Sequence, residues 1–305
     1  MSDATRFFEP WEQASIANWQ DFQAEVNELT ARYEGHRLVW RGVRDASWGV
    51  HSSLSRALRQ VYGRYPTENE MVAAEKESLR LAREDWRFDG VPALELLAQL
   101  QHFGGPTRLL DVSENPLIAL WFATEEPRKD EAENDGRVLA FVAPTTRDIH
   151  LNDRWNGRNA RWHSLTTDFA RVEKRWGTGL GRSYWRPPTY HGRIGSQSAG
   201  FLLDGVPLEG ARGGLGQRSP EIEEAWTAAE MREFASIPMK LTHIRRGNLA
   251  ADSAPVFTYR LKAGAKPDIR HQLQVRYSLR ASSIYSDMFG LAAHLASRPE
   301  LLARG

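Results

Sequence analysis

The chain has 305 residues, which is long enough to bury a sizeable hydrophobic core in one large domain or two smaller ones. A hydrophobic content of 41% argues against a disordered chain, and a formal net charge of +1 argues against a general attraction to nucleic acids or membranes. With no cysteine, no apolar leader and no stretch of transmembrane length, the chain is expected to be cytoplasmic and to lack disulfides, thiolate metal sites and cysteine nucleophiles.

The N-terminal region is predicted to combine a helix and a strand. Apolar residues recur at helical spacing in residues 15–33, so residues 1–36 are expected to form an N-terminal helical segment. The short run RLVWRGV (37–43) is rich in residues that favour strands and contains Gly42 near its end. We therefore expect the first strand of a sheet there.

Further helices and strands are predicted along the rest of the chain. The helices are expected at 67–86, 91–103, 219–235, 266–277 and 282–297, and the strands at 137–143, 199–205, 239–244 and 256–262. Thr67 and Glu70 match a capping box, and Ser219 followed by Pro220 matches a second helix start. Helices cluster early and strands mostly late, so the predicted fold class is α+β.

One segment, residues 145–193, differs in composition from the rest. It holds nine Arg and one Lys against four acidic residues, together with seven aromatic residues. Interleaved Arg and aromatic side chains are typical of grooves that bind single-stranded nucleic acid. The alternative is an insertion whose tryptophans pack on the core while Arg side chains reach the solvent. A Gly-rich loop is expected next, at residues 204–219.

The stretch QHFGGPTRLLDVSENPLIALWFA (101–123) interrupts an apolar run with Arg108 and Asp111. The Gly-Gly-Pro segment stops the preceding helix, and the next residues are expected to be extended. Ser113 is predicted to be the N-cap of a helix over 114–126, which places Asp111 beside free backbone N–H groups, where anions bind. An internal ion pair between Arg108 and Asp111 would account for both residues equally well.

Two parts of the sequence resemble the FRG domain, a family named for an aromatic-Arg-Gly motif. They are VWRGV (39–43) and LLAQLQHFGGPTRLLDVSENPLIALWFA (96–123). RIGSQSAGF (193–201) and SSIYSDMFGLAAHL (282–295) resemble the family's later blocks, Arg-x-x-x-Gln-x-x-Gly-Phe and Tyr-x-Asp-x-x-Gly-Leu. The resemblance implies an FRG domain over residues 37–296.

The family's order of elements is similar to that of ADP-ribosyltransferases. The resemblance implies a split antiparallel sheet core with N-terminal and C-terminal helices, and NAD as a substrate without a metal. It also implies a toxin or phage-defence effector that acts on a macromolecular acceptor such as RNA or DNA, with an antitoxin or immunity protein as partner and no membrane association.

The resemblance implies roles for individual residues. Arg41 would hold a phosphate or ribose. Gln197 occupies the position of the late catalytic Glu, and an amide lacks the negative charge that stabilises a developing cation. Asp111 would supply that charge and His102 would shuttle protons. The further cofactor-binding candidates are Arg108, Ser113 and Phe122.

A structural reading remains open for each of these residues. Arg41 would pair with an acid at the end of the sheet, His102 would bind free carbonyls at the end of its helix, and Gln197 would satisfy buried backbone groups. The matching alternative function is a non-catalytic module that binds nucleic acid or protein, with Arg41, Arg108 and Gln197 as its recognition pocket.

Overall fold

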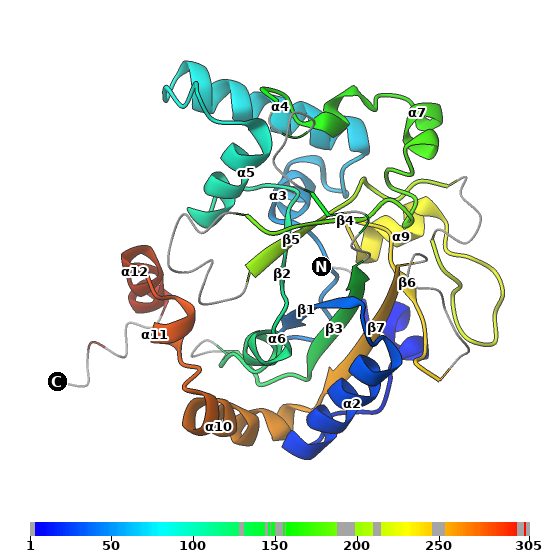
Figure 1. Cartoon of the computed structure of the whole chain (residues 1–305), viewed down its shortest axis with the longest axis vertical. Coiled ribbons are helices and arrows are strands. Elements are labelled where there is room, and N and C mark those ends of the chain that lie inside the picture. Colours follow the sequence, from blue (N-terminus) through cyan, green and yellow to red (C-terminus); the bar gives the residue numbers. More distant parts are fainter. Residues whose placement is uncertain are drawn as a thin grey trace.

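The computed structural model describes residues 4–127, 131–143, 146, 148–149, 155, 157–187, 199–209, 215–245, 254–297 and 302. Helices lie on both faces of one curled sheet (Figure 1). The predicted α+β class is confirmed. Gln197, part of the 145–193 insertion and part of the Gly-rich loop at 204–219 lie outside the described residues.

The described strands form a seven-stranded sheet in the order β4-β5-β2-β1-β3-β7-β6. The strands are β1 (Arg37–Val43), β2 (Leu110–Ser113), β3 (Gly136–Ala143), β4 (Ser183–Trp185), β5 (Ala199–Leu203), β6 (Lys240–Leu241) and β7 (Pro255–Leu261). Every neighbouring pair is antiparallel except β6 and β7, which are parallel. The sheet is therefore continuous and mixed, in contrast to the split antiparallel sheet that the family resemblance implied.

Strand β3 lies inside the sheet, between β1 and β7, and is buried on both faces. Val138, Ala140 and Val142 pack into one hydrophobic cluster, and Leu139 and Phe141 pack into a second. Successive side chains of a strand point to opposite faces, so a strand with helices on both sides needs apolar residues at every position. This explains the apolar run from Val138 to Ala143 in β3.

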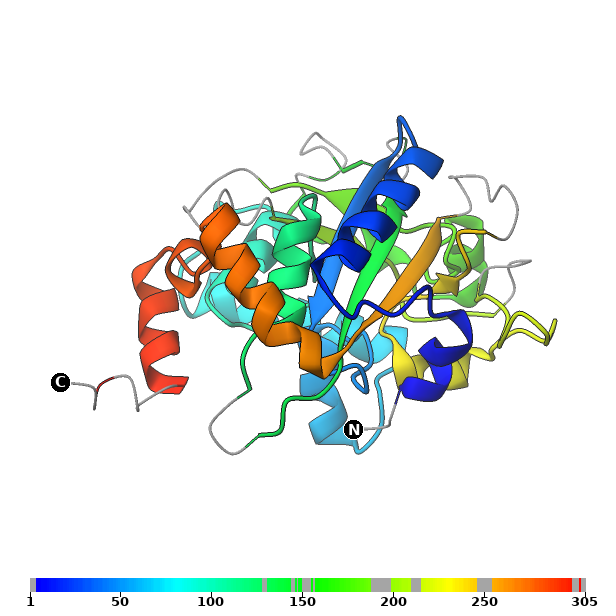
Figure 2. The ribbon, with the colours of Figure 1, turned by 90° about the horizontal axis from the view of Figure 1, so that it is seen from below.

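The helices fall into groups that cover different parts of the sheet. They are α1 (Thr5–Phe8), α2 (Trp19–Arg32), α3 (Ser53–Tyr62), α4 (Glu68–Glu84), α5 (Ala93–His102), α6 (Pro116–Ala123), α7 (Asp168–Glu173), α9 (Ala228–Phe234), α10 (Lys266–Tyr277), α11 (Ala281–Ile284) and α12 (Met288–Ser297). Helices α2, α6 and α10 lie side by side on one face (Figure 2). Helices α1 and α9 pack on the opposite face.

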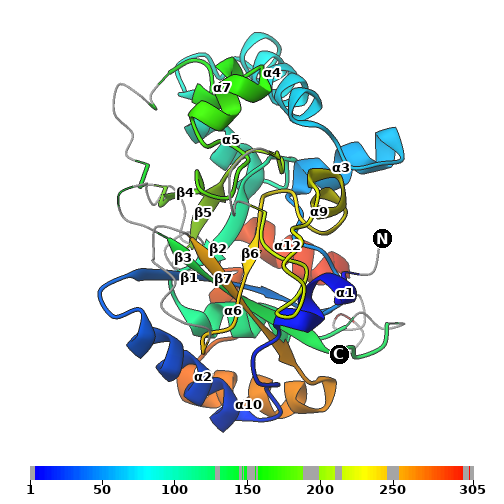
Figure 3. The same ribbon diagram turned by 90° about the vertical axis from the view of Figure 1, so that its right-hand side faces the viewer.

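Helices α4, α5 and α7 gather at the end of the molecule opposite α2 and α10 (Figure 3). A third hydrophobic cluster lies at that end and joins α4 and α5 to strands β4 and β5 and to the tryptophans of the 145–193 segment. Residues of α5 and α6 line a pocket together with residues of the curled sheet. The candidate functional site lies there.

The prediction of a helix over 219–235 is wrong in its first half. Helix α9 begins at Ala228, where Thr227 and Glu230 form a capping box. Before it the chain folds back on itself, because the Arg218 amide donates to the Glu224 carbonyl oxygen. Ser219 accepts a hydrogen bond from the Glu221 amide and closes a local turn, so its capping capacity is used outside the helix.

Two other predicted helix boundaries also differ from the structure. Asn115, and not Ser113, is the N-cap of α6, since its side chain accepts a hydrogen bond from the Leu117 amide. The helix expected at 282–297 is divided into α11 and α12 by Tyr285, Ser286 and Asp287. That interruption contributes directly to the site described below.

Candidate functional site

A pocket of about 340 Å³ lies between helices α5 and α6 and strands β1, β2 and β5. Its lining includes the sequence-predicted residues Arg41, His102, Asp111, Ser113 and Phe122. These residues come from four elements that are separated along the chain. The fold therefore brings together most of the candidates that the sequence suggested.

The glycine of the VWRGV motif lets α6 lie directly on β1. A Cβ atom at Gly42 would lie 1.8 Å from the carbonyl oxygen of Ala119, so no larger residue fits without displacing the helix. Strand β1 pairs with β2 at Trp40 and Ser113. Trp40 is only 2% exposed and contributes apolar surface to the pocket. The motif thus brings the backbone of α6 close to the strand that carries Arg41.

Arg41 contributes a cation that forms no ion pair with an acid of the described residues, although the nearby Asp111 carboxylate attracts it. Its Nη1 donates to the main-chain oxygen of Asp111 at 2.7 Å. Its Nε is buried and has no hydrogen-bond partner among the described residues, where it also forms no ion pair. Burial lowers the pKa of the guanidinium, which still remains charged in water near neutral pH. The expected pairing of Arg41 with an acid at the sheet end is not seen, and an anionic ligand would satisfy the free Nε.

Gln101 orients Asp111. The Gln101 Nε2 donates to Asp111 Oδ1 at 2.7 Å and to the Leu109 carbonyl oxygen at 3.2 Å, while the Thr107 hydroxyl donates to Gln101 Oε1. This leaves the second oxygen of the exposed Asp111 carboxylate without a hydrogen bond from the described residues. The sequence motif contained Gln101, but its role emerges only from these contacts.

His102 is the last residue of α5, and its side chain is 8% exposed. The helix stops there because Gly104 adopts a positive φ of 85° and ends the helical backbone. The imidazole Nε2 lies 3.4 Å from Oδ2 of Asp287, which precedes α12. The imidazole of His102 therefore faces an acidic side chain from the C-terminal segment. The sequence did not predict this contact.

Ser113 and Phe122 line the pocket in different ways. Ser113 is 5% exposed, and its hydroxyl accepts a hydrogen bond from the Asn115 amide, which shapes the turn into α6. Phe122 contacts Tyr285 edge to face, with ring centroids 6.3 Å apart. Phe201 and Tyr285 add further aromatic surface that the sequence reading did not assign. The pocket therefore has aromatic walls and, among its polar groups, three side chains suited to charge or proton transfer: Arg41, His102 and Asp111.

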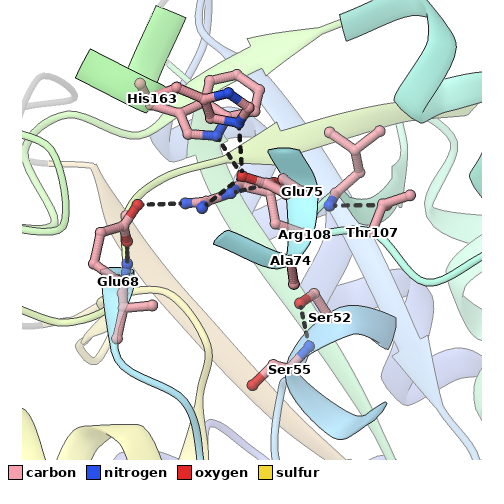
Figure 4. Close-up of polar contacts among 12 residues, drawn as sticks. Ser52, Ser55, Glu68, Ala74, Glu75, Thr107, Arg108 and His163 are labelled. Atoms are coloured by element: carbon pink, nitrogen blue, oxygen red, sulfur yellow. Dashed lines mark hydrogen bonds and ion pairs between the residues drawn. The ribbon is translucent and has the colours of Figure 1, made fainter. Parts of the chain in front are cut away.

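Arg108 has a structural role, which corrects its assignment as a cofactor-binding residue. It is not among the residues that line the pocket. Its side chain is 2% exposed and lies between Glu68 and Glu75, with Nη1 2.8 Å from Glu68 Oε1 and Nε 2.6 Å from Glu75 Oε1 (Figure 4). The expected alternative, an ion pair with Asp111, does not form either. The two acids that replace Asp111 lie seven residues apart, on one face of α4.

Two tryptophans of the 145–193 segment, Trp162 and Trp176, pack against this ion pair. Trp162 Nε1 donates to Glu75, Trp176 Nε1 donates to Glu68, and the two rings stack with centroids 5.5 Å apart. Trp162, Trp176 and Trp185 are each at most 6% exposed. Buried rings cannot stack on bases, so the packing alternative is confirmed for these three tryptophans.

These observations define an α+β protein whose pocket has aromatic walls and carries both a cationic and an acidic side chain. Residues 36–132 match the family model of the FRG domain. This matched range contains Arg41, His102 and Asp111. The chain therefore contains an FRG domain over residues 36–132. No curated protein and no solved structure matches it. Within the described residues, no helix has the length and apolar character needed to cross a membrane.

Proposed function

We propose that this protein binds NAD in the pocket and cleaves the bond between nicotinamide and ribose, in the manner of an ADP-ribosyltransferase. The observation that supports the proposal best is the convergence of Arg41, Asp111 and His102 on one aromatic-walled pocket. Each of these groups matches a requirement of glycosyl transfer from a charged dinucleotide: a phosphate anchor, a carboxylate and a proton acceptor.

Arg41 is the proposed phosphate anchor. Its buried Nε lacks a partner in the described part of the chain, and a phosphate oxygen would supply one together with the opposite charge. The aromatic walls formed by Trp40, Phe122 and Tyr285 suit the planar nicotinamide ring. A volume of about 340 Å³ is at the small end of ligand pockets, so the proposed occupant is the nicotinamide mononucleotide half of NAD, whose phosphate would meet Arg41.

Asp111 is the proposed stabiliser of the transition state. When the ribose C1′–N bond breaks, nicotinamide leaves with the bonding electrons and positive charge develops on the ribose. A carboxylate held by Gln101 opposes that charge, in place of the late Glu of ADP-ribosyltransferases. Water or an acceptor group then forms the new bond to C1′, and its proton passes to His102.

The test is the release of free nicotinamide from NAD by the purified protein, with and without total RNA or cell lysate. We expect release by the wild type and at least a hundredfold loss, to order of magnitude, in Arg41→Gln and Asp111→Asn. Arg80→Gln is the matched control, because Arg80 lies on the exposed face of α4 and pairs there with Glu77, Glu84 and Asp85, away from the pocket. Unchanged release in both site variants would refute the proposal.

The family resemblance suggests the biological setting of this chemistry. We propose a toxin or phage-defence effector that modifies a macromolecule such as RNA or DNA and is restrained by an antitoxin or immunity protein. Expression in a bacterial host should then be toxic for the wild type and harmless for Arg41→Gln. If folded protein releases no nicotinamide with any addition, the alternative, a non-catalytic binding module, is favoured.

A further inference from the structure

The segment Tyr285–Gly290 lies beside the pocket and contributes Tyr285 to its wall. Tyr285 lines the pocket and packs edge to face on Trp121, with ring centroids 5.6 Å apart, while its hydroxyl donates to Glu125 at 3.1 Å. The segment lies where the predicted C-terminal helix is interrupted. It coincides with the Tyr-x-Asp-x-x-Gly block of the sequence, which has no role in the function proposed above.

Gly290 allows this segment to turn tightly. A Cβ atom at Gly290 would lie 2.7 Å from Tyr285 Cβ and 2.8 Å from the Tyr285 carbonyl oxygen. The Gly290 amide donates to Asp287 Oδ1 at 2.6 Å, so the carboxylate caps the N-terminus of α12. One oxygen of Asp287 is thereby fixed by the backbone that follows it.

The other oxygen of Asp287 faces His102. Oδ2 is buried, and among the described residues no hydrogen-bond donor reaches it; its ionic partner there is His102 Nε2, 3.4 Å away. A buried carboxylate oxygen without a donor is costly, and an imidazole that carries its proton on Nε2 reduces that cost. The pair joins residues that are 185 positions apart, so only the folded chain can form it.

We propose that Asp287 is a positioning residue that holds the imidazole of His102 in one orientation and tautomer at the pocket. This inference rests on the proposed function for its catalytic meaning. As the attacking water or acceptor loses its proton, the imidazole takes that proton and becomes imidazolium. The Asp287 carboxylate stabilises the cation, and the proton is later released to solvent. No further reactant is needed.

Nuclear magnetic resonance of the His102 ring tests the pairing without any reaction. The ring nitrogens are compared in the wild type and in Asp287→Asn, with His102→Gln identifying the signals. We expect the Nε2-protonated tautomer in the wild type and a proton affinity about tenfold lower in Asp287→Asn. The Asn oxygen still accepts the Gly290 amide, so the cap of α12 is retained. An unchanged tautomer and titration midpoint would overturn the proposal.

Nicotinamide release separates this inference from the proposed function. In Asp287→Asn we expect at least about a tenfold loss of turnover, with NAD affinity within about twofold of the wild type. Asp268→Asn, on the exposed start of α10, is the matched control and should leave both quantities unchanged. Full turnover in Asp287→Asn would reject the positioning role. If the wild type itself releases no nicotinamide, the proposed function fails, and the resonance experiment still decides the pairing.

Discussion

Arg108 and Glu75 form a bidentate ion pair inside the protein, with Nε 2.6 Å from Oε1 and Nη2 2.8 Å from Oε2. Glu68 adds a second carboxylate at 2.8 Å, and the Trp162 and Trp176 rings lie over the guanidinium. These contacts connect the residues just before β2 to helix α4 and to the 145–193 segment. Arg108 therefore stabilises the region behind the pocket and does not line the pocket itself.

Arg108→Met should destabilise the protein strongly, since it leaves two buried carboxylates without their cation. We expect a loss of about 3–5 kcal/mol in the free energy of unfolding, measured by urea denaturation. Arg80→Met, which removes an exposed pair on the same helix α4, should change stability little. If both substitutions lowered the free energy of unfolding equally, the buried ion pair would contribute no more to stability than the exposed one.

Trp176→Phe should lower stability by about 1–3 kcal/mol, because the indole N–H that donates to Glu68 is lost in a buried place. Thermal and urea unfolding measure the change. Trp86→Phe is the control, since Trp86 is 67% exposed. A loss of nucleic-acid binding in Trp176→Phe without a loss of stability would contradict the structural role of this ring.

Gly42→Ala should displace α6 from β1. The new methyl group would lie 1.8 Å from the Ala119 carbonyl oxygen, and overpacking of this kind costs about 1–3 kcal/mol or more. Gly90→Ala places its methyl group in open space and serves as the control. We expect a lower midpoint of thermal unfolding and weaker ligand binding for Gly42→Ala only. A Gly42→Ala variant as stable as Gly90→Ala would contradict the close contact.

Asp204 should make stability depend on pH. Burial raises the pKa of its carboxyl to about 6, although the Gly177 and Gly205 amides donate to Oδ1 at 2.7 Å. A folded-state pKa above the unfolded value means that the stabilising contribution is present below about pH 4 and is lost as the pH rises through 6. The loss amounts to about 3 kcal/mol.

Asp204→Asn should remove this dependence, because the amide oxygen still accepts both backbone N–H groups and no charge is buried. Urea denaturation at about pH 4.5 and 7.5 checks the expectation. The wild type should lose stability relative to the variant between these values. If the two proteins changed in parallel, Asp204 would not titrate in this range.

Local pattern was sufficient for much of the fold. The strand at 37–43 and the helices near 67–86, 91–103 and 266–277 appear close to their predicted bounds, because apolar spacing and capping residues act within a few positions. The prediction at 219–235 was wrong in its first half, since two capping signals competed and a local turn used the first.

The motifs of the chain were enough to name candidate site residues: Arg41, His102, Asp111, Ser113 and Phe122 were predicted, and all five line one pocket. The partners of the charged groups depend instead on how the chain folds. The Arg108 guanidinium could have paired with Asp111, three residues away, and instead it pairs with acids 33 and 40 residues away. His102 meets an acid 185 residues away. Ion pairs form between the groups that packing buries together, and packing depends on the whole chain.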